Sequence, residues 1–182
     1  VAVTAYAAPY GGFMDGVDDI YAQSSSFTMQ LPMYALFTAT KYLAANTAFF
    51  GARLDSSNYF LIRNSSSGTG SGASSLLSTA RGASSTTATV NEWPLNQPAV
   101  IDSLALVGTT DHRINNNTSS VVANTWLAPD TVAASKMTIA IATNNAVGTV
   151  LFLGGMLVVA DPGVGDRAKL KTYFGAVAGL TL

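Results

Sequence analysis

The closing stretch of the chain, Leu151–Leu182, predicts a buried strand, a sharp break and one helix. The strand is indicated by the apolar run at Met156–Val159. The sequence Asp161-Pro162-Gly163 follows it, and this combination of turn formers ends regular structure. A chain that is otherwise strand and turn, and that is closed by a single helix, can adopt only a few architectures.

The predicted helix runs from about Asp166 to Ala178 and is amphipathic. Four apolar residues fall at i, i+3, i+4 and i+7 of a helical period: Leu170, Tyr173, Phe174 and Val177. Asp166 stands near the start of the helix and Gly179 just past its end, where a cap and a stop are favoured. We expect the apolar face to pack on the strands.

Short apolar segments alternate with turn signals along the rest of the chain. Pro32 interrupts the segment Phe27–Thr40 and predicts a break or an edge position, because proline cannot donate to a sheet ladder. A hairpin is indicated by Ala48–Arg53 and Tyr59–Arg63. Further strand-like segments are Thr86–Trp93, Ala99–Gly108, Ser120–Trp126, Met137–Ala142 and Thr149–Leu153. This even spacing of short strands predicts an all-β, antiparallel two-sheet sandwich with one short C-terminal helix.

The composition fits one domain with a sizeable core and a nearly uncharged surface. The chain has 182 residues, of which 48% are hydrophobic and only 10% are charged, with a formal net charge of −1. It has no basic run, which argues against a nucleic-acid partner, and no cysteine, which excludes disulfides and thiolate metal sites. The most apolar run, Val147–Ala160, suits a buried core segment better than a membrane span. Such a surface is typical of a module packed into an assembly or exposed outside cells.

Four segments carry a resemblance to a known family. They are FMDGVDDIYAQ (Phe13–Gln23), AFFGARLDSSNYFLIRN (Ala48–Asn64), HRINNN (His112–Asn117) and the closing stretch from Phe152 to Leu182. In this order they resemble the laminin-G-like, concanavalin A-like jelly-roll domain of the kind found in bacteriophage virion proteins. The resemblance covers the chain from about Phe13 to Leu182 and implies one jelly-roll domain (residues 13–182). Residues 1–12 before it are expected to be an N-terminal arm or a lead-in strand.

The resemblance implies a structural and interaction module on the surface of a virion. It would serve as a capsid decoration, fibre or tail-associated protein, with other virion proteins or further copies of itself as partners. The uncharged, apolar segment Val1–Tyr10 would then be ordered by a neighbouring subunit. The alternative is a carbohydrate-binding lectin module for adhesion to a host surface, with a cell-surface glycan as its ligand.

The sequence offers no convincing catalytic residues, so we expect the protein not to be an enzyme. Glycosidases of this sandwich type need two nearby carboxylates on one strand, and the chain has a single glutamate, Glu92. His112 is the only histidine, and its neighbour Asp111 should point to the opposite face of a strand. We interpret His112 as a surface or interface residue.

The densest acidic cluster is Asp15, Asp18 and Asp19, which could supply two or three oxygens to a calcium ion. The other interpretation is local turn chemistry, with Asp15 before a glycine and the other two carboxylates bonding nearby backbone amides. No other cofactor is indicated.

Candidate ligand-binding residues lie in the loops and at strand ends. Short amides and hydroxyls there can hydrogen-bond a sugar or a protein, and aromatic rings can serve as flat platforms for a sugar. The candidates are Asp55, Asn58, Tyr59, Asn64, Trp93, Asn115, Asn116, Asn117 and Trp126. The aromatic members could equally belong to the core or to an interface.

Overall fold

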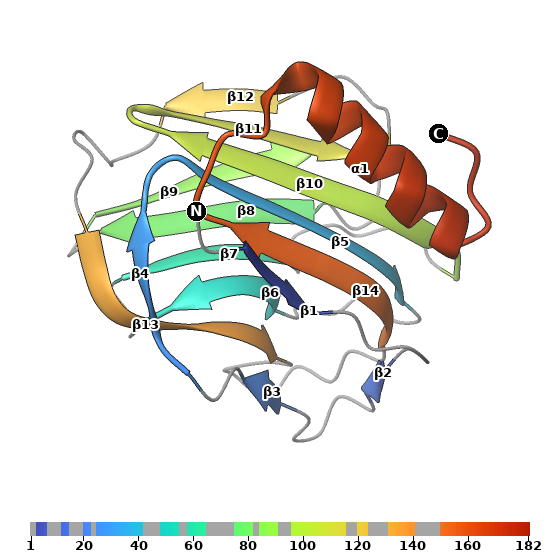
Figure 1. The fold of residues 1–182 in the computed structure, drawn as a ribbon, viewed down its shortest axis with the longest axis horizontal. Helices are drawn as coiled ribbons and strands as arrows, with labels where there is room; N and C mark the ends of the chain where they lie inside the picture. The colour runs from blue at the N-terminus through green and yellow to red at the C-terminus, as the bar shows by residue number, and fades with distance from the viewer. Residues whose placement is uncertain are drawn as a thin grey trace.

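The computed structural model describes residues 3–6, 12–14, 20–22, 25–41, 48–54, 58–64, 75–81, 84–90, 96–115, 120–123, 131–140 and 150–182. The described strands form two antiparallel sheets, and one helix lies on the outer face of the first of them (Figure 1). This confirms the predicted antiparallel sandwich with a C-terminal helix.

The first sheet, which we call the helix-bearing sheet, has the order β1-β14-β5-β10-β11-β12, with β2 pairing β14. Its strands are β1 (Val3–Tyr6), β2 (Gly12–Met14), β5 (Met33–Lys41), β10 (Pro98–Leu106), β11 (Thr109–Ile114), β12 (Ser120–Ala123) and β14 (Val150–Val158). β5 and β10 form its centre. They are buried on both faces, which explains why their sequences are almost continuously apolar.

The second sheet, the opposite sheet, has the order β3-β13-β6-β7-β8-β9, with β4 pairing β13. Its strands are β3 (Ile20–Ala22), β4 (Phe27–Gln30), β6 (Ala48–Arg53), β7 (Tyr59–Asn64), β8 (Ser75–Arg81), β9 (Ser84–Val90) and β13 (Thr131–Ala140). The hairpin predicted from the sequence is β6 and β7, closed by a hydrogen bond from the Leu54 N–H to the Asn58 carbonyl at 3.0 Å.

The chain passes from the opposite sheet to the helix-bearing sheet at Leu31-Pro32. β4 pairs with β13, whereas β5 pairs with β14 and β10. The break predicted at Pro32 is therefore confirmed, and it separates two strands that belong to different layers.

One expectation about the N-terminal arm is wrong. Residues Val3–Tyr6 form β1 and pair with β14 of the same chain, with Val3 opposite Val158 and Tyr6 opposite Gly155. This part of the segment Val1–Tyr10 is thus an edge strand of its own sandwich and needs no neighbouring subunit to order it. The arm and domain boundaries themselves stay predictions.

The helix α1 (Gly163–Val177) begins three residues before the predicted start. The N-cap position is Pro162, which makes no side-chain capping hydrogen bond, and Asp166 lies in the first turn without capping the helix. The Asp161 side chain accepts a hydrogen bond from the Gly163 N–H at 2.8 Å, which closes the turn that leads into α1. Gly179 follows the last turn with φ +71°, a left-handed conformation that glycine adopts without strain, and confirms the predicted stop.

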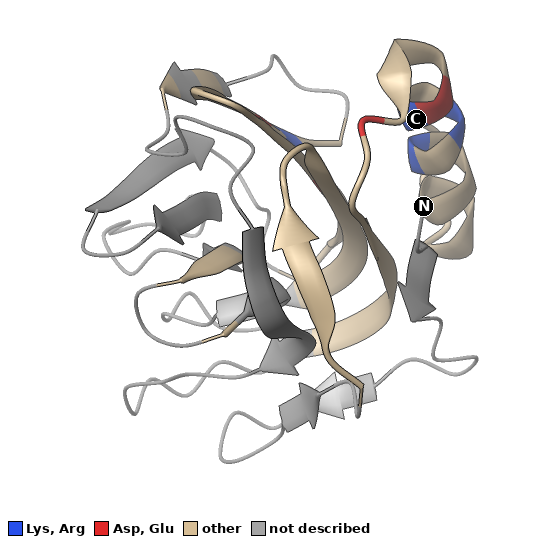
Figure 2. Cartoon of the chain, turned by 60° about the vertical axis from the view of Figure 1, so that its left-hand side comes forward, with Lys and Arg blue, Asp and Glu red and all other residues tan. Residues whose placement is uncertain are grey.

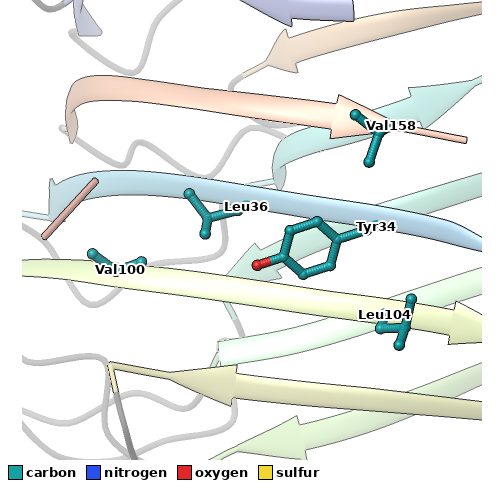
Figure 3. Close-up of a cluster of buried hydrophobic side chains, with 5 residues drawn as sticks. All are labelled: Tyr34, Leu36, Val100, Leu104 and Val158. Atoms are coloured by element: carbon teal, nitrogen blue, oxygen red, sulfur yellow. The ribbon is translucent and has the colours of Figure 1, made fainter. Parts of the chain in front are cut away.

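The helix packs on the outer face of the helix-bearing sheet (Figure 2). A cluster of buried apolar residues on β5, β10 and β14 lies beneath it: Tyr34, Leu36, Val100, Leu104 and Val158 (Figure 3). Leu170 and Phe174 pack against this cluster, as predicted, but Tyr173 and Val177 are 65% and 51% exposed. The face that is buried instead carries Arg167, Lys171 and Gly175.

We predict that Phe174→Ala lowers the free energy of unfolding by about 2 kcal/mol, less than for a fully buried aromatic ring. Phe174 is half-buried, and its ring edge lies over Gly154, where an added Cβ would stand 3.4 Å from Phe174 Cε1. Urea unfolding monitored by circular dichroism measures the change. Val164→Ala, at the start of the same helix where the side chain is 87% exposed, is the control and should change stability by less than about 0.5 kcal/mol. Equal losses in both variants would mean that α1 is not docked through Phe174.

Candidate functional site

The densest group of ionisable side chains in the described residues lies between α1 and the helix-bearing sheet. Alternate residues of a strand face the same side, so Asp102 of β10 and Asp111 and Arg113 of β11 all point outward toward the helix. Arg167 and Lys171, one helical turn apart on α1, face them. We call these five residues the docking cluster.

Arg167 is the centre of the docking cluster. Its Nη2 and Nε atoms donate to Asp102 Oδ2 at 2.6 and 3.2 Å, and its Nη1 donates to Asp111 Oδ2 at 2.9 Å. Arg113 Nη2 donates to the same Asp111 oxygen at 2.8 Å. Lys171 Nζ stands 3.9 Å from Asp102 Oδ1, too far for a direct hydrogen bond.

The charges of the docking cluster stabilise one another. Burial would raise the pKa of the Asp111 carboxyl, but hydrogen bonds from Arg113 and Arg167 hold it below its ordinary value. Burial would likewise lower the pKa of Arg167, but the charge of Asp102 raises it. Asp111 and Arg167 therefore stay ionised at neutral pH, and their ion pair helps to hold α1 on the sheet.

Tyr34 completes this junction on the side of β5. Arg167 Cζ lies 5.4 Å from the centroid of the Tyr34 ring, within the range of a cation–π contact. Burial, and next the charge of Asp102, raise the pKa of the Tyr34 hydroxyl far above its ordinary value. Tyr34 thus stays protonated and cannot act as a base at neutral pH.

His112 is buried, and the prediction of a surface or interface position is wrong. It lies on the inner face of β11, opposite Ser103 of β10, and its Nδ1 contacts the Ser103 hydroxyl. Asp111 does point to the other face of the strand, as expected, so the aspartate and the histidine do not form a catalytic pair. Burial lowers the pKa of His112 to about 3.

We predict that stability falls as the pH is lowered from about 6.5 toward 4, because the unfolded chain protonates His112 in this window and the folded chain does not. The loss should reach about 1 kcal/mol per pH unit. Below the ordinary pKa of aspartate, 3.8, Asp111 adds a loss of the same sign. Urea unfolding at several pH values measures the slope. The same series of unfolding measurements on His112→Gln should show a much smaller slope of the unfolding free energy against pH. An unchanged slope would contradict the assignment of this pH dependence to His112.

Four of the predicted binding residues belong to the described part of the chain, and these four do not lie together. Asn58 and Tyr59 stand where β6 turns into β7, whereas Asn64 ends β7 and Asn115 follows the end of β11. In Figure 1, β6 and β10 point to one end of the sandwich and β7 and β11 to the other. The four candidates that the structure describes are therefore divided between the two ends of the sandwich.

Asn115 has a structural role of its own. It has φ +51°, its N–H donates to the Val100 carbonyl at 2.6 Å, and its Oδ1 accepts from the Val100 N–H at 2.9 Å. This exchange closes the end of the β10–β11 ladder. The other predicted site residues, which lie outside the described residues, are Asp15, Asp18, Asp19, Asp55, Trp93, Asn116, Asn117 and Trp126.

An apolar groove of about 360 Å³ opens beside the docking cluster, between β14 and the first half of α1. Met156, Val158 and Leu170 line it, together with Ala160 and Pro162. The ion pair between Asp166 and Lys169, at 2.9 Å, stands on its rim. The surface of the groove is thus almost entirely apolar, and Asp166 and Lys169 are the charged residues that line it.

Within the described ranges, no three histidine, aspartate or glutamate side chains gather in the way that a metal ion requires. The described helix is too short and too polar to span a bilayer.

Solved structures share this arrangement of strands. A botulinum neurotoxin type C, whose cell entry is described as dependent upon interaction with two ganglioside molecules, has a TM-score of 0.60 and 9% identity, over 90% of this chain and 46% of that one. A SAP-like pentraxin from Limulus polyphemus has a TM-score of 0.55 and 11% identity, over 86% of this chain and 82% of that one. A polysaccharide lyase of family 18 has a TM-score of 0.53 and 9% identity, over 84% and 82%.

The fold is a concanavalin A-like jelly roll. The chain spans about half the length of the botulinum neurotoxin structures that it matches. At these identities the jelly-roll likeness shows the fold alone. No protein-family model matches the sequence. No curated protein matches it either.

Sequence reasoning missed the docking cluster, although a signal for it exists. Asp102 is the one carboxylate in the apolar strand Pro98–Leu106, and a buried carboxylate needs a cation. Arg167 and Lys171 are spaced i, i+4 on the predicted helix and were available as partners. Together these features indicate a charged docking face for the jelly-roll helix.

Proposed function

We propose that this chain is a non-catalytic interaction module on the exterior of a bacteriophage particle, as a capsid decoration, fibre or tail-associated protein. The observation that carries the proposal is the jelly-roll sandwich in which the described buried ionisable groups serve the fold: the docking cluster fixes α1, and His112 is buried beside Ser103. The sequence resemblance to virion jelly-roll domains and the low charge content support an exposed place in an assembly.

The place in the particle is tested with antibodies raised against the purified, folded chain. They should label intact particles of the phage that encodes the chain, as seen by immunogold electron microscopy. Labelling only of disrupted particles, or of free protein in the lysate, would contradict an exterior position. A cytosolic bacterial protein would be labelled only as free protein in the lysate.

Carbohydrate recognition is the second candidate, and the solved structures with this fold favour it. They include a neurotoxin binding domain in complex with SialylT and a neurotoxin whose cell entry is described as dependent upon interaction with two ganglioside molecules. Two more are a polysaccharide lyase and an alginate lyase. This chain shares only its fold with the pentraxin and the neurotoxins. That it binds a carbohydrate is therefore a proposal.

A glycan array with the isolated chain tests this second candidate, and the positions of the loops make the test specific. Tyr59 and Asn64 lie at opposite ends of β7, which are about 17 Å apart for six residues. If a glycan binds at one end of the sandwich, the alanine variant at that end, Tyr59→Ala or Asn64→Ala, should abolish the array signal. The variant at the opposite end then serves as the folded control. If the chain gives no signal on the array but still binds phage particles, contact with other virion proteins is its function.

The absence of catalysis is tested directly, because two of the similar folds belong to lyases. The purified chain should release no new reducing ends or unsaturated products from alginate or other polysaccharides. Cleavage that Glu92→Ala abolishes would overturn the proposal.

A further inference from the structure

The junction between α1 and the helix-bearing sheet leaves two buried polar atoms without a partner among the described residues: Asp102 Oδ1 and the Tyr34 hydroxyl. Both side chains are fully buried. The other Asp102 oxygen, Oδ2, already accepts two hydrogen bonds from Arg167. A buried carboxylate oxygen and a buried hydroxyl each destabilise the folded state by a few kcal/mol unless they are hydrogen-bonded.

These two atoms face the same small region. The ring of Tyr34 extends from β5 toward β10, with its hydroxyl directed between Val100 and Leu104, the two neighbours of Asp102 on that face (Figure 3). Asp102 and Arg167 both act on Tyr34 through their charges and through the close approach of their side chains, although no hydrogen bond of good geometry joins the Tyr34 hydroxyl to either. Lys171, which is 7% exposed, reaches the region from α1 with Nζ 3.9 Å from Asp102 Oδ1.

A separation of 3.9 Å between a donor and an acceptor is too long for a hydrogen bond and suits one bridging molecule. The bridge must accept from an ammonium group and donate to a carboxylate at the same time. An anion would be repelled by Asp102, and a metal cation would be repelled by Lys171 and Arg167. A neutral water molecule meets both requirements, and buried waters typically make about three such hydrogen bonds.

We propose that one water molecule is bound between Asp102 Oδ1, Lys171 Nζ and the Tyr34 hydroxyl, as an integral part of the α1 junction. The water accepts from Lys171, donates to Asp102 and shares a hydrogen bond with Tyr34. It completes the hydrogen bonding of Asp102 and links the second basic residue of α1 to the sheet. The proposal does not depend on what the chain binds.

A high-resolution crystal structure of the unmodified chain tests the proposal. We expect a water peak about 2.7–3.2 Å from Asp102 Oδ1 and from Lys171 Nζ or the Tyr34 hydroxyl. Direct contact of Lys171 or Tyr34 with Asp102 Oδ1, without a water, would overturn the proposal. An ion at the same position, recognised by its anomalous signal, would overturn it as well.

Magnetic relaxation dispersion of ¹⁷O in solution gives a second measurement that does not need crystals. The unmodified chain should hold one more long-lived water than the double variant Tyr34→Phe/Lys171→Met. The control is Tyr173→Phe/Lys169→Met, which removes the same two groups from exposed positions of α1 and should retain the water. Loss of a long-lived water in the control, or an unchanged count in the buried double variant, would contradict the site. If the buried double variant does not fold, the crystal structure of the unmodified chain decides.

Discussion

Replacing Arg167 with methionine is expected to lower the free energy of unfolding by about 3 kcal/mol. Methionine keeps most of the apolar stem but removes the guanidinium, which leaves Asp102 as a carboxylate with no exposure to water. Of the two other cations of the docking cluster, Arg113 stands opposite Asp102 on β11 but pairs with Asp111, and Lys171, at 3.9 Å, compensates the charge of Asp102 only in part. The loss should therefore lie at the low end of the range for a broken buried ion pair. Urea unfolding measures it.

Two further variants show whether the uncompensated charge is the cause. Lys169→Met removes a cation of the same helix whose ion pair with Asp166 is exposed, and it should leave the unfolding midpoint unchanged. Arg167→Met/Asp102→Leu removes both charges and should recover most of the stability, since apolar replacements of buried pairs are often neutral. A loss of less than about 1 kcal/mol in Arg167→Met, which is the range of an exposed pair, would show that the docking cluster does not hold α1.

Replacing Gly155 with alanine is expected to cost about 3 kcal/mol, at the upper end for overpacking. An added Cβ would stand 2.9 Å from the Leu36 carbonyl oxygen and 2.9 Å from Phe37 Cβ, and both belong to the neighbouring strand β5. A backbone atom in a central strand cannot move aside as the end of a flexible side chain can. The clash therefore acts on the ladder between β14 and β5.

Gly165→Ala is the matched control for this substitution. Gly165 lies in the first half of α1, and an added Cβ would meet no atom within 4 Å. Alanine favours a helix over glycine by up to about 1 kcal/mol, so the same chemical change should stabilise the protein. Thermal unfolding of the two variants should shift the midpoints in opposite directions, and a neutral Gly155→Ala would mean that β14 and β5 pack less closely than described.

The elements of the fold could be predicted from local signals. Pro32 separated two strands, the turn formers after Arg53 indicated a hairpin, and Asp161-Pro162-Gly163 placed the break before the helix. Each of these signals acts within a few residues, where backbone geometry decides the outcome. The assignment of β4 and β5 to different sheets could not be predicted, because it depends on pairing with strands far along the chain.

The buried face of α1 could be predicted only in part. Counting apolar residues found Leu170 and Phe174 but also selected Tyr173 and Val177, which are exposed. The helix turns toward the sheet the side that carries Arg167, because Asp102 lies beneath it and a buried carboxylate without a cation would strongly destabilise the folded state. Periodicity of hydrophobic residues cannot detect such a partner on another element.

The position of His112 shows a second limit. Alternation along β11 correctly separated Asp111 from His112, but it did not tell which of the two faces was interior. The interior face of β11 also carries Thr110 and Ile114, and there the Ser103 hydroxyl of the paired strand contacts the imidazole. The loop residues proposed for binding stay predictions.

The position of β14 has a consequence for how the chain is made. This strand lies between β1 and β5 and pairs with both, although it follows them by most of the length of the sequence. A ribosome therefore releases β5 long before the strand that covers its edge. Until β14 emerges, the nascent chain presents an apolar strand edge that invites pairing with another nascent chain. The helix-bearing sheet can be completed only after β14 has been synthesised. We therefore expect the yield of folded protein to depend more on growth temperature and chaperone supply than on the stability of the folded state.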